Sequence, residues 1–159
     1  MAKSAGEIDA GVKDTLKLFN SEVFDGKKLI KRANAVLVFP SVIKAGIGIG
    51  GEYGEGALMV DGKAVDYYST AAGSVGFQLG AQKKSIIILF NDKYAYKNFK
   101  RSNGWKAGVD ASVALIKIGA GGAIDTNELN EPIVGFIFGQ KGLMYNLTLE
   151  GSKFSKLNK

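Results

Sequence analysis

The spacing of apolar residues predicts a helix at the start of the chain. Apolar side chains recur there at intervals of three and four, which places them on one helical face: Ile8, Val12, Leu16, Phe19 and Val23. Ser4 followed three positions later by Glu7 has the form of a capping box and marks the start of this helix. Gly26 interrupts the pattern and marks its end.

A short second helix follows the glycine. Leu29, Ile30 and Ala33 are predicted to face inward. The outward face is entirely basic and consists of Lys27, Lys28, Lys31 and Arg32. Amphipathic helices of this kind usually pack on the core of their own domain, and the alternative is that they lie flat on a bilayer.

From residue 35 onward the pattern changes to strands with mostly short connections. Apolar or alternating segments lie at 35–39, 57–60, 64–68, 74–80, 84–91, 109–118, 133–138 and 143–149. Pro40 is expected to end the first of them. Asp61–Gly62 predicts a two-residue hairpin turn, and Asn91–Asp92 predicts the cap of a short helix that runs to about Lys100.

These elements predict one α+β domain over 1–159, with a helical part at 1–35 and a glycine-rich β part at 36–159. Two N-terminal helices are expected to pack on a strongly curved, partly closed, barrel-like antiparallel sheet of about seven or eight strands. The glycines account for the curvature: six of the eleven residues from Gly46 to Gly56 are glycine, and Gly73, Gly76 and Gly80 follow in the next strand region. Glycine permits sharp bends and close approach of two backbones.

The composition restricts the chemistry that the chain can perform. It contains neither cysteine nor histidine, which excludes thiolate and imidazole catalysis and metal binding by these groups. Residues 46–51 match GxGxxG formally, but a hairpin follows instead of the helix that a dinucleotide site requires. We predict no cofactor and no metal site. An enzyme would depend on carboxylates, and Glu52 and Glu55 are the candidate pair.

The net charge of +6 is concentrated in one quarter of the chain. Residues 81–120 carry eight basic side chains, from Lys83 and Lys84 to Lys117, and only two acidic ones. Within this quarter, residues 93–106 interleave five basic residues with Tyr94, Tyr96, Phe99 and Trp105. Such a segment fits phospholipid headgroups or single-stranded nucleic acid. The competing interpretations are a solvated basic face and a short helix whose aromatic residues are core anchors, with at least one of them buried.

Four segments resemble a known family. Residues 36–56 read VLVFPSVIKAGIGIGGEYGEG, and the motifs YST at 68–70, GSVGFQLGA at 73–81 and NLTLEG at 146–151 follow. Together they resemble the SYLF domain, also called the yeast actin-patch type lipid-binding domain. The resemblance implies a non-enzymatic domain that binds membrane phospholipids, and this chain is most similar to the stand-alone bacterial branch. Neither actin nor phosphoinositides would then be expected as ligands, and we expect no nucleic acid.

The resemblance therefore implies docking on an anionic phospholipid membrane surface. In eukaryotic relatives a basic amphipathic N-terminal segment is associated with lipid binding, and the second helix has that position and character. The predicted lipid-binding residues are Lys27, Lys28, Lys31, Arg32, Lys93, Lys97, Lys100, Arg101, Trp105 and Lys106. The alternatives are a container for a small ligand inside the curved sheet, a structural scaffold, and a carboxylate enzyme.

Localisation is predicted from the same resemblance. Bacterial members are often exported, so we expect a periplasmic or exported protein whose signal sequence is absent from this chain. Residues 1–10 contain no apolar h-region. No apolar run reaches the length of a membrane span. Association with the membrane would therefore be peripheral.

Overall fold

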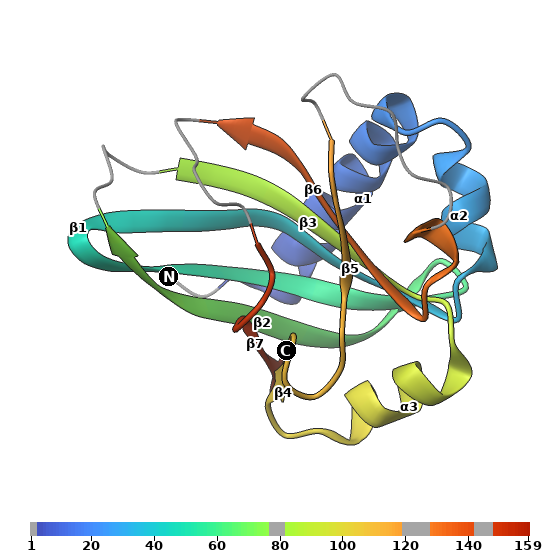
Figure 1. Ribbon diagram of the computed structural model, residues 1–159. Helices are drawn as coiled ribbons and strands as arrows, with labels where there is room; N and C mark the ends of the chain where they lie inside the picture. Colours follow the sequence, from blue (N-terminus) through green and yellow to red (C-terminus); the bar gives the residue numbers. More distant parts are fainter. Residues whose placement is uncertain (1–2, 77–81, 119–127, 142–147) are drawn as a thin grey trace.

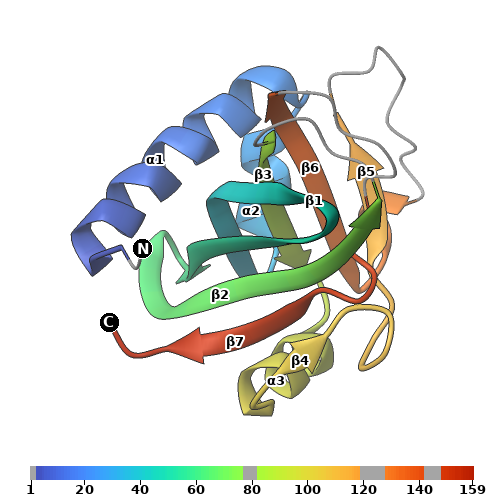
Figure 2. The same ribbon diagram turned by 90° about the vertical axis from the view of Figure 1, so that its left-hand side faces the viewer.

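The computed structural model describes residues 3–76, 82–118, 128–141 and 148–159. The helices are α1 (Ala5–Glu22), α2 (Gly26–Arg32), α3 (Lys93–Arg101) and the 3₁₀ turn η1 (Glu128–Asn130). The strands are β1 (Ala35–Val60), β2 (Lys63–Gly76), β3 (Gln82–Phe90), β4 (Trp105–Lys106), β5 (Ala114–Lys117), β6 (Ile133–Lys141) and β7 (Lys153–Leu157). They form one strongly curved sheet in the order β4-β7-β2-β1-β3-β6-β5 (Figures 1 and 2).

The first helix, α1, begins and packs as its sequence predicts. The backbone N–H of Glu7 donates to Ser4 Oγ at 3.2 Å, and the backbone N–H of Ser4 donates to Glu7 Oε1 at 3.3 Å, which completes the capping box. Ile8, Val12 and Phe19 of α1 are buried against the sheet.

The α+β class and the curved sheet are confirmed, although the sheet is mixed, because β5 pairs with β6 in parallel. A connection of many residues between β5 and β6 permits this direction.

The prediction that Pro40 ends a strand is wrong. β1 continues through Pro40 to Val60, and the register between β1 and β3 shifts between Phe39 and Val42. This irregularity accommodates a residue without an N–H, and Ser85 Oγ donates to the Pro40 carbonyl at 2.8 Å.

The hairpin turn that joins β1 to β2 is confirmed, because Asp61 and Gly62 have φ values of 52° and 77°, both in the left-handed region that this turn requires.

Other predicted strands differ in extent. The segment 109–118 forms a strand only in β5, and Ala111 adds one isolated bridge to Ala107. Most of the predicted strand 143–149 and the end of 74–80 lie outside the described residues. β4 and β7 were not predicted. The short helix after Asn91 is confirmed as α3, whose N-cap Asp92 accepts a hydrogen bond from the Ala95 N–H at 3.0 Å.

Alternate residues of the central strands support two cores on opposite faces of the sheet. On one face, Val36 and Val38 of β1 pack with α1 and α2. On the other face, Leu37 and Phe39 pack beneath α3. Rings fill this second core, with Phe99 at 4.8 Å from Phe90 and 5.4 Å from Trp105 between centroids. Aromatic side chains therefore occupy the described part of the face on which the sequence allowed a ligand container.

The glycine-rich run brings two stretches of β1 close together. A Cβ atom built on Gly54 would lie 2.8 Å from the Ser41 carbonyl oxygen, and one on Gly56 would lie 2.7 Å from the Phe39 ring. The second half of β1 thus passes directly over the first half, as expected for glycines at a close crossing. The pairing of Gly51 with Gly73 confirms that the two glycine-rich segments are neighbouring strands.

Candidate functional site

One end of the sheet gathers α2, α3 and η1. Ala35 pairs with Phe90 and Phe90 with Ile133, so the end of α2, the start of α3 and the start of β6 meet there. Asn91 joins them, because its Nδ2 donates to the Leu129 carbonyl at 3.1 Å and to the Glu131 carbonyl at 3.0 Å. Figure 1 shows α2 and α3 together at the right-hand end of the molecule. We call this region the α2–α3 end.

The four basic residues of α2 lie on its exposed face, as predicted. Lys27, Lys28, Lys31 and Arg32 are all exposed. Arg32 also has a structural contact, because its Nη2 donates to the Leu129 carbonyl at 3.2 Å.

The turn between α1 and α2 presents an aromatic side chain that sequence reasoning missed. Phe24 is 91% exposed, the largest exposed fraction among the exposed large hydrophobic residues described. The available signal was its position, directly after Val23 and therefore off the apolar stripe of α1. An exposed phenylalanine beside basic residues is characteristic of interaction with an apolar–polar boundary.

α3 adds a second basic and aromatic surface at this end. Lys93, Lys97, Lys100 and Arg101 of α3 are exposed, and Lys106 of the edge strand β4 is exposed as well. Tyr94 is 72% exposed. Lys100 is partly engaged within the domain, since its Nζ lies 4.0 Å from Asp66 Oδ2 and 5.8 Å from the centroid of the Tyr96 ring.

Trp105 does not belong to this surface. It is 3% exposed and packs edge-on against Phe99 in the core. The prediction that it contacts lipid is therefore wrong, because its ring cannot reach a bilayer without unfolding β4. The competing expectation, that at least one aromatic residue of the 93–106 segment is buried, is confirmed by Phe99 and Trp105.

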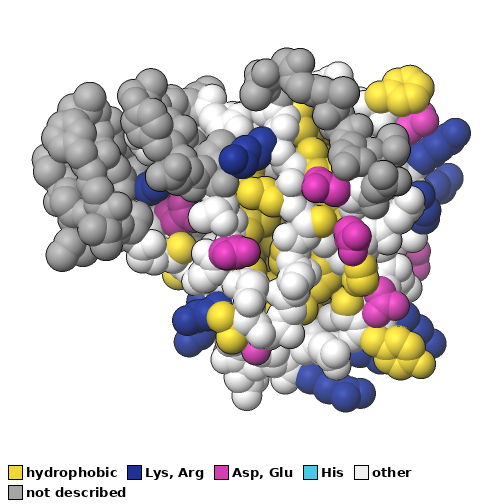
Figure 3. Space-filling model, viewed as in Figure 1, with side chains coloured by type: hydrophobic (Ala, Val, Ile, Leu, Met, Phe, Trp, Pro, Cys, Tyr) yellow, Lys and Arg dark blue, Asp and Glu magenta, His cyan; other side chains and the backbone are white. Residues whose placement is uncertain are grey.

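The basic side chains of α2 and α3 lie toward one end of the sheet, although the two helices cover opposite faces. Figure 3 shows Lys and Arg along the right-hand edge of the molecule, where Figure 1 has α2 and α3, with acidic side chains between them. The charge there is therefore mixed. An anionic partner at this end would meet basic groups on both flanks.

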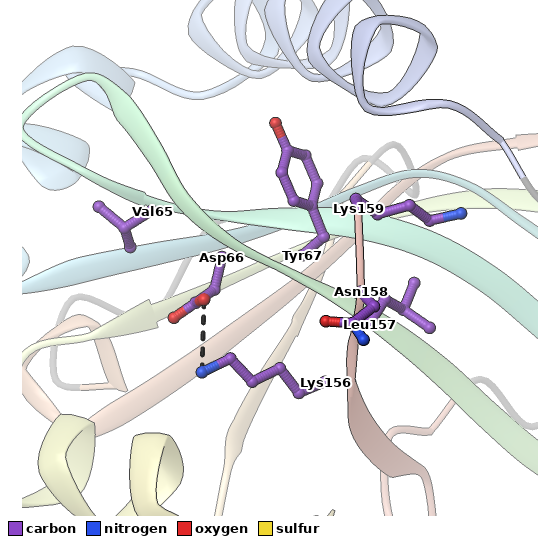
Figure 4. Close-up of a pocket in the computed structure, with 7 residues that line it drawn as sticks. All are labelled: Val65, Asp66, Tyr67, Lys156, Leu157, Asn158 and Lys159. Carbon is purple, nitrogen blue, oxygen red and sulfur yellow. Dashed lines mark ion pairs between the residues drawn. The ribbon is translucent and has the colours of Figure 1, made fainter.

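Surface grooves lie on both sides of α2. One has a volume of about 700 Å³ and lies between α2 and the β1–β2 turn, and the other, of about 680 Å³, lies between α2 and the α1–α2 turn and includes Phe24. A third hollow, of about 520 Å³, lies along β2 and β7 (Figure 4). In that hollow the Lys156 Nζ faces Asp66 Oδ1 at 3.4 Å, so charge is already paired within it.

The two candidate catalytic carboxylates line one surface hollow of about 430 Å³, but their side chains have different partners. Glu52 and Glu55 differ by an odd number of positions in a regular part of β1, so their side chains leave the strand in different directions. Glu52 forms an ion pair with Lys84 at 2.9 Å. Glu55 accepts hydrogen bonds from the Lys3 N–H and the Tyr53 hydroxyl, both at 2.8 Å, and faces Lys159 Nζ at 3.5 Å. This arrangement does not assemble an acid–base pair.

Glu55 makes folding stability depend on pH. Burial raises the pKa of Glu55, but the hydrogen bonds from Lys3 and Tyr53 and the charge of Lys159 outweigh it, so the pKa lies below its usual value of 4.5. A lowered folded-state pKa contributes stability above the unfolded pKa, and this contribution is lost as pH falls through the folded pKa. We expect Glu55→Gln to lower the free energy of unfolding at neutral pH by about 1–3 kcal/mol.

The measurement is urea unfolding of the wild type and Glu55→Gln from neutral pH down to acid pH. The difference between the two proteins should be constant at neutral pH and shrink as pH falls below 4.5 and through the lowered folded-state pKa of Glu55. Glu22→Gln, which changes an exposed carboxyl on α1, is the matched control. A difference that is independent of pH would show that the charge of Glu55 is not the cause.

Two features are not found in the described part of the chain. No group of three or more acidic side chains lies close enough there to hold a metal ion. Among the helices in the same residues, none is both long enough and apolar enough to cross a bilayer.

Comparison with known proteins identifies the family. The model of the family described as "Ysc84: Las17-binding protein actin regulator" matches residues 71–159, more than half of the chain. A curated relative, the SH3 domain-containing protein PJ696.02 of Schizosaccharomyces pombe, is 28% identical over 94% of this chain. The match covers 36% of that relative, so the chain spans about a third of its length. The chain belongs to the Ysc84 family of SYLF domains.

Proposed function

We propose that this domain docks peripherally on anionic phospholipid membranes through the α2–α3 end. The observation that carries the proposal is Phe24, a phenylalanine with 91% exposure in the turn that leads into four exposed basic residues of α2. An apolar ring enters the interface while lysine and arginine side chains pair with lipid phosphates. Each basic residue near an anionic surface contributes about 1 kcal/mol, so several are needed for reversible binding.

The basic residues of α3 extend the same surface. Lys93 and Lys97 flank Tyr94, and an exposed tyrosine is suited to the headgroup region. Lys100 and Arg101 lie in the last turn of α3 and Lys106 lies in β4, and all three add long-range attraction, which salt screens. Membrane contacts by both α2 and α3 would fix the orientation of the sheet relative to the membrane.

The test is co-sedimentation with vesicles that contain phosphatidylglycerol. We expect Lys28→Gln/Lys31→Gln to weaken binding roughly thirtyfold, because two contacts of about 1 kcal/mol are lost. The single variant Phe24→Ala should also weaken vesicle binding. It should leave the salt dependence of binding unchanged, since it removes no charge. Lys93→Gln/Lys97→Gln measures the share of α3.

The matched control is Lys44→Gln/Lys83→Gln, which removes the same charge from the opposite end of the same sheet, where Lys44 pairs with Gln82. It should retain most of the binding. Equal losses in the control and the α2 variant would contradict docking through the α2–α3 end. Equal recovery of the wild type with neutral and anionic vesicles would contradict the proposal as a whole.

The family description favours actin regulation as a second candidate function. Our proposal is an exported bacterial domain that binds phospholipid without catalysing a reaction, so it predicts no pelleting with actin filaments. Filament binding that the Lys28→Gln/Lys31→Gln variant leaves intact would support the second candidate.

A further inference from the structure

The groove between α2 and the β1–β2 turn combines an apolar floor with a basic rim. Its volume is about 700 Å³, within the range of sites that hold small molecules. The floor consists of Leu16, Ile30, Ala33, Val36 and Met59, and the rim carries Lys27, Lys28 and Lys31, with Asp61 and Gly62 of the turn opposite.

The floor is an uncovered part of the hydrophobic core. Val36 is 4% exposed, but Leu16, Ile30, Ala33 and Met59 are only partly buried where they pack on that core. Contiguous apolar surface at the bottom of a groove is costly to leave in water. An apolar chain laid along these side chains would complete their burial.

The rim determines what kind of apolar chain fits. None of the ion pairs found among the described residues involves Lys27, Lys28 or Lys31. Three cations against the single carboxylate of Asp61 leave the groove lining with a positive excess. The complementary ligand therefore has an anionic head that reaches the lysines and a linear tail that covers the floor.

We propose that this groove binds one phosphate-headed, single-chain lipid as a monomer, with its acyl chain on the floor and its phosphate at the three lysines. The inference deepens the proposed function, because α2 supplies lysines to both. It differs in mechanism, since a monomer occupies a groove whereas docking engages a bilayer surface through Phe24.

Met59 provides a direct probe of the floor. The chain contains three methionines, so ¹³C-methyl labelling gives three resonances, and Met59→Leu assigns the relevant one. The wild-type domain is titrated with monododecyl phosphate below its micelle concentration, with dodecyl maltoside as the uncharged chain, and with inorganic phosphate as the head alone. We expect a saturable Met59 shift with the first ligand, about a hundredfold weaker binding of the second because three lysine contacts of about 1 kcal/mol are lost, and no shift with the third. An unchanged Met59 resonance with monododecyl phosphate would overturn the proposal, and equal affinity for the two dodecyl compounds would overturn the role of the lysines.

Two variants separate the groove from the docking surface. Ala33→Phe fills the floor without changing charge and should abolish the monomer titration while vesicle binding persists. Phe24 lies outside this groove, so Phe24→Ala should weaken vesicle binding and leave the monomer titration unchanged. Circular dichroism tests whether the Ala33→Phe variant is folded. If it is not folded, the wild-type titration alone decides whether the groove binds the monomer. If the wild type binds vesicles but not the monomer, the groove proposal is refuted and the docking proposal stands. If it binds the monomer but not vesicles, the docking proposal is refuted and the groove proposal stands.

Discussion

Gly56→Ala is expected to destabilise the domain severely, lowering the free energy of unfolding by about 3 kcal/mol or more. The added methyl group would clash with the Val38 carbonyl oxygen and lie 2.7 Å from Phe39 Cδ1. Backbone cannot rotate away as a flexible side chain can, so the crossing within β1 must open. The chain has one tryptophan, Trp105, and it is buried, so its fluorescence in a urea titration reports the loss directly.

Gly73→Ala is the matched control for this substitution. Gly73 lies in β2, paired with Gly51, and a Cβ atom there would have no neighbour within 4 Å. Alanine also restricts the unfolded chain more than glycine does, so this variant should stay within about 1 kcal/mol of the wild type or gain stability. Equal destabilisation by both substitutions would contradict the close crossing as the cause, because Gly73 in β2 takes no part in that crossing.

Local signals in the sequence predicted local structure well. The capping box at Ser4 and the Asp61–Gly62 turn involve neighbouring residues, so their patterns are sufficient to specify them. The prediction at Pro40 failed because it assumed a regular hydrogen-bond ladder, in which proline lacks a needed N–H. The register shift beside Pro40 removes the need for that N–H. β4 has two residues and therefore no periodicity, and its pairing with β7 depends on contacts distant in sequence.

The candidate surface was only partly predictable for a related reason. The count of basic residues included Lys84, but that side chain is buried, because its partner Glu52 lies on the neighbouring strand. Interleaved lysines and aromatic residues describe a membrane-facing segment and an amphipathic core helix equally well. Tertiary packing decides between them, and it buries Trp105 but leaves Tyr94 exposed.

The ion pair between Lys84 and Glu52 is expected to produce the second large effect. Their side chains are 3% and 8% exposed, and Lys84 Nζ lies 2.9 Å from Glu52 Oε2. Glu52→Gln leaves a buried ammonium group without a counter-charge, so the free energy of unfolding should fall by about 3–5 kcal/mol. Lys84→Met leaves the carboxylate alone and should cost a similar amount. Urea unfolding at neutral pH measures both.

The double variant Lys84→Met/Glu52→Gln separates desolvation from attraction. Because it removes both charges, its loss should be at least about 2 kcal/mol smaller than the sum of the two single losses. The comparison pair is Lys156 and Asp66, whose side chains are 53% and 21% exposed. Lys156→Met should cost less than about 1 kcal/mol, because water screens that contact. Additive losses at Lys84 and Glu52 would mean that each residue acts through packing alone, and that the ion pair does not hold β1 against β3.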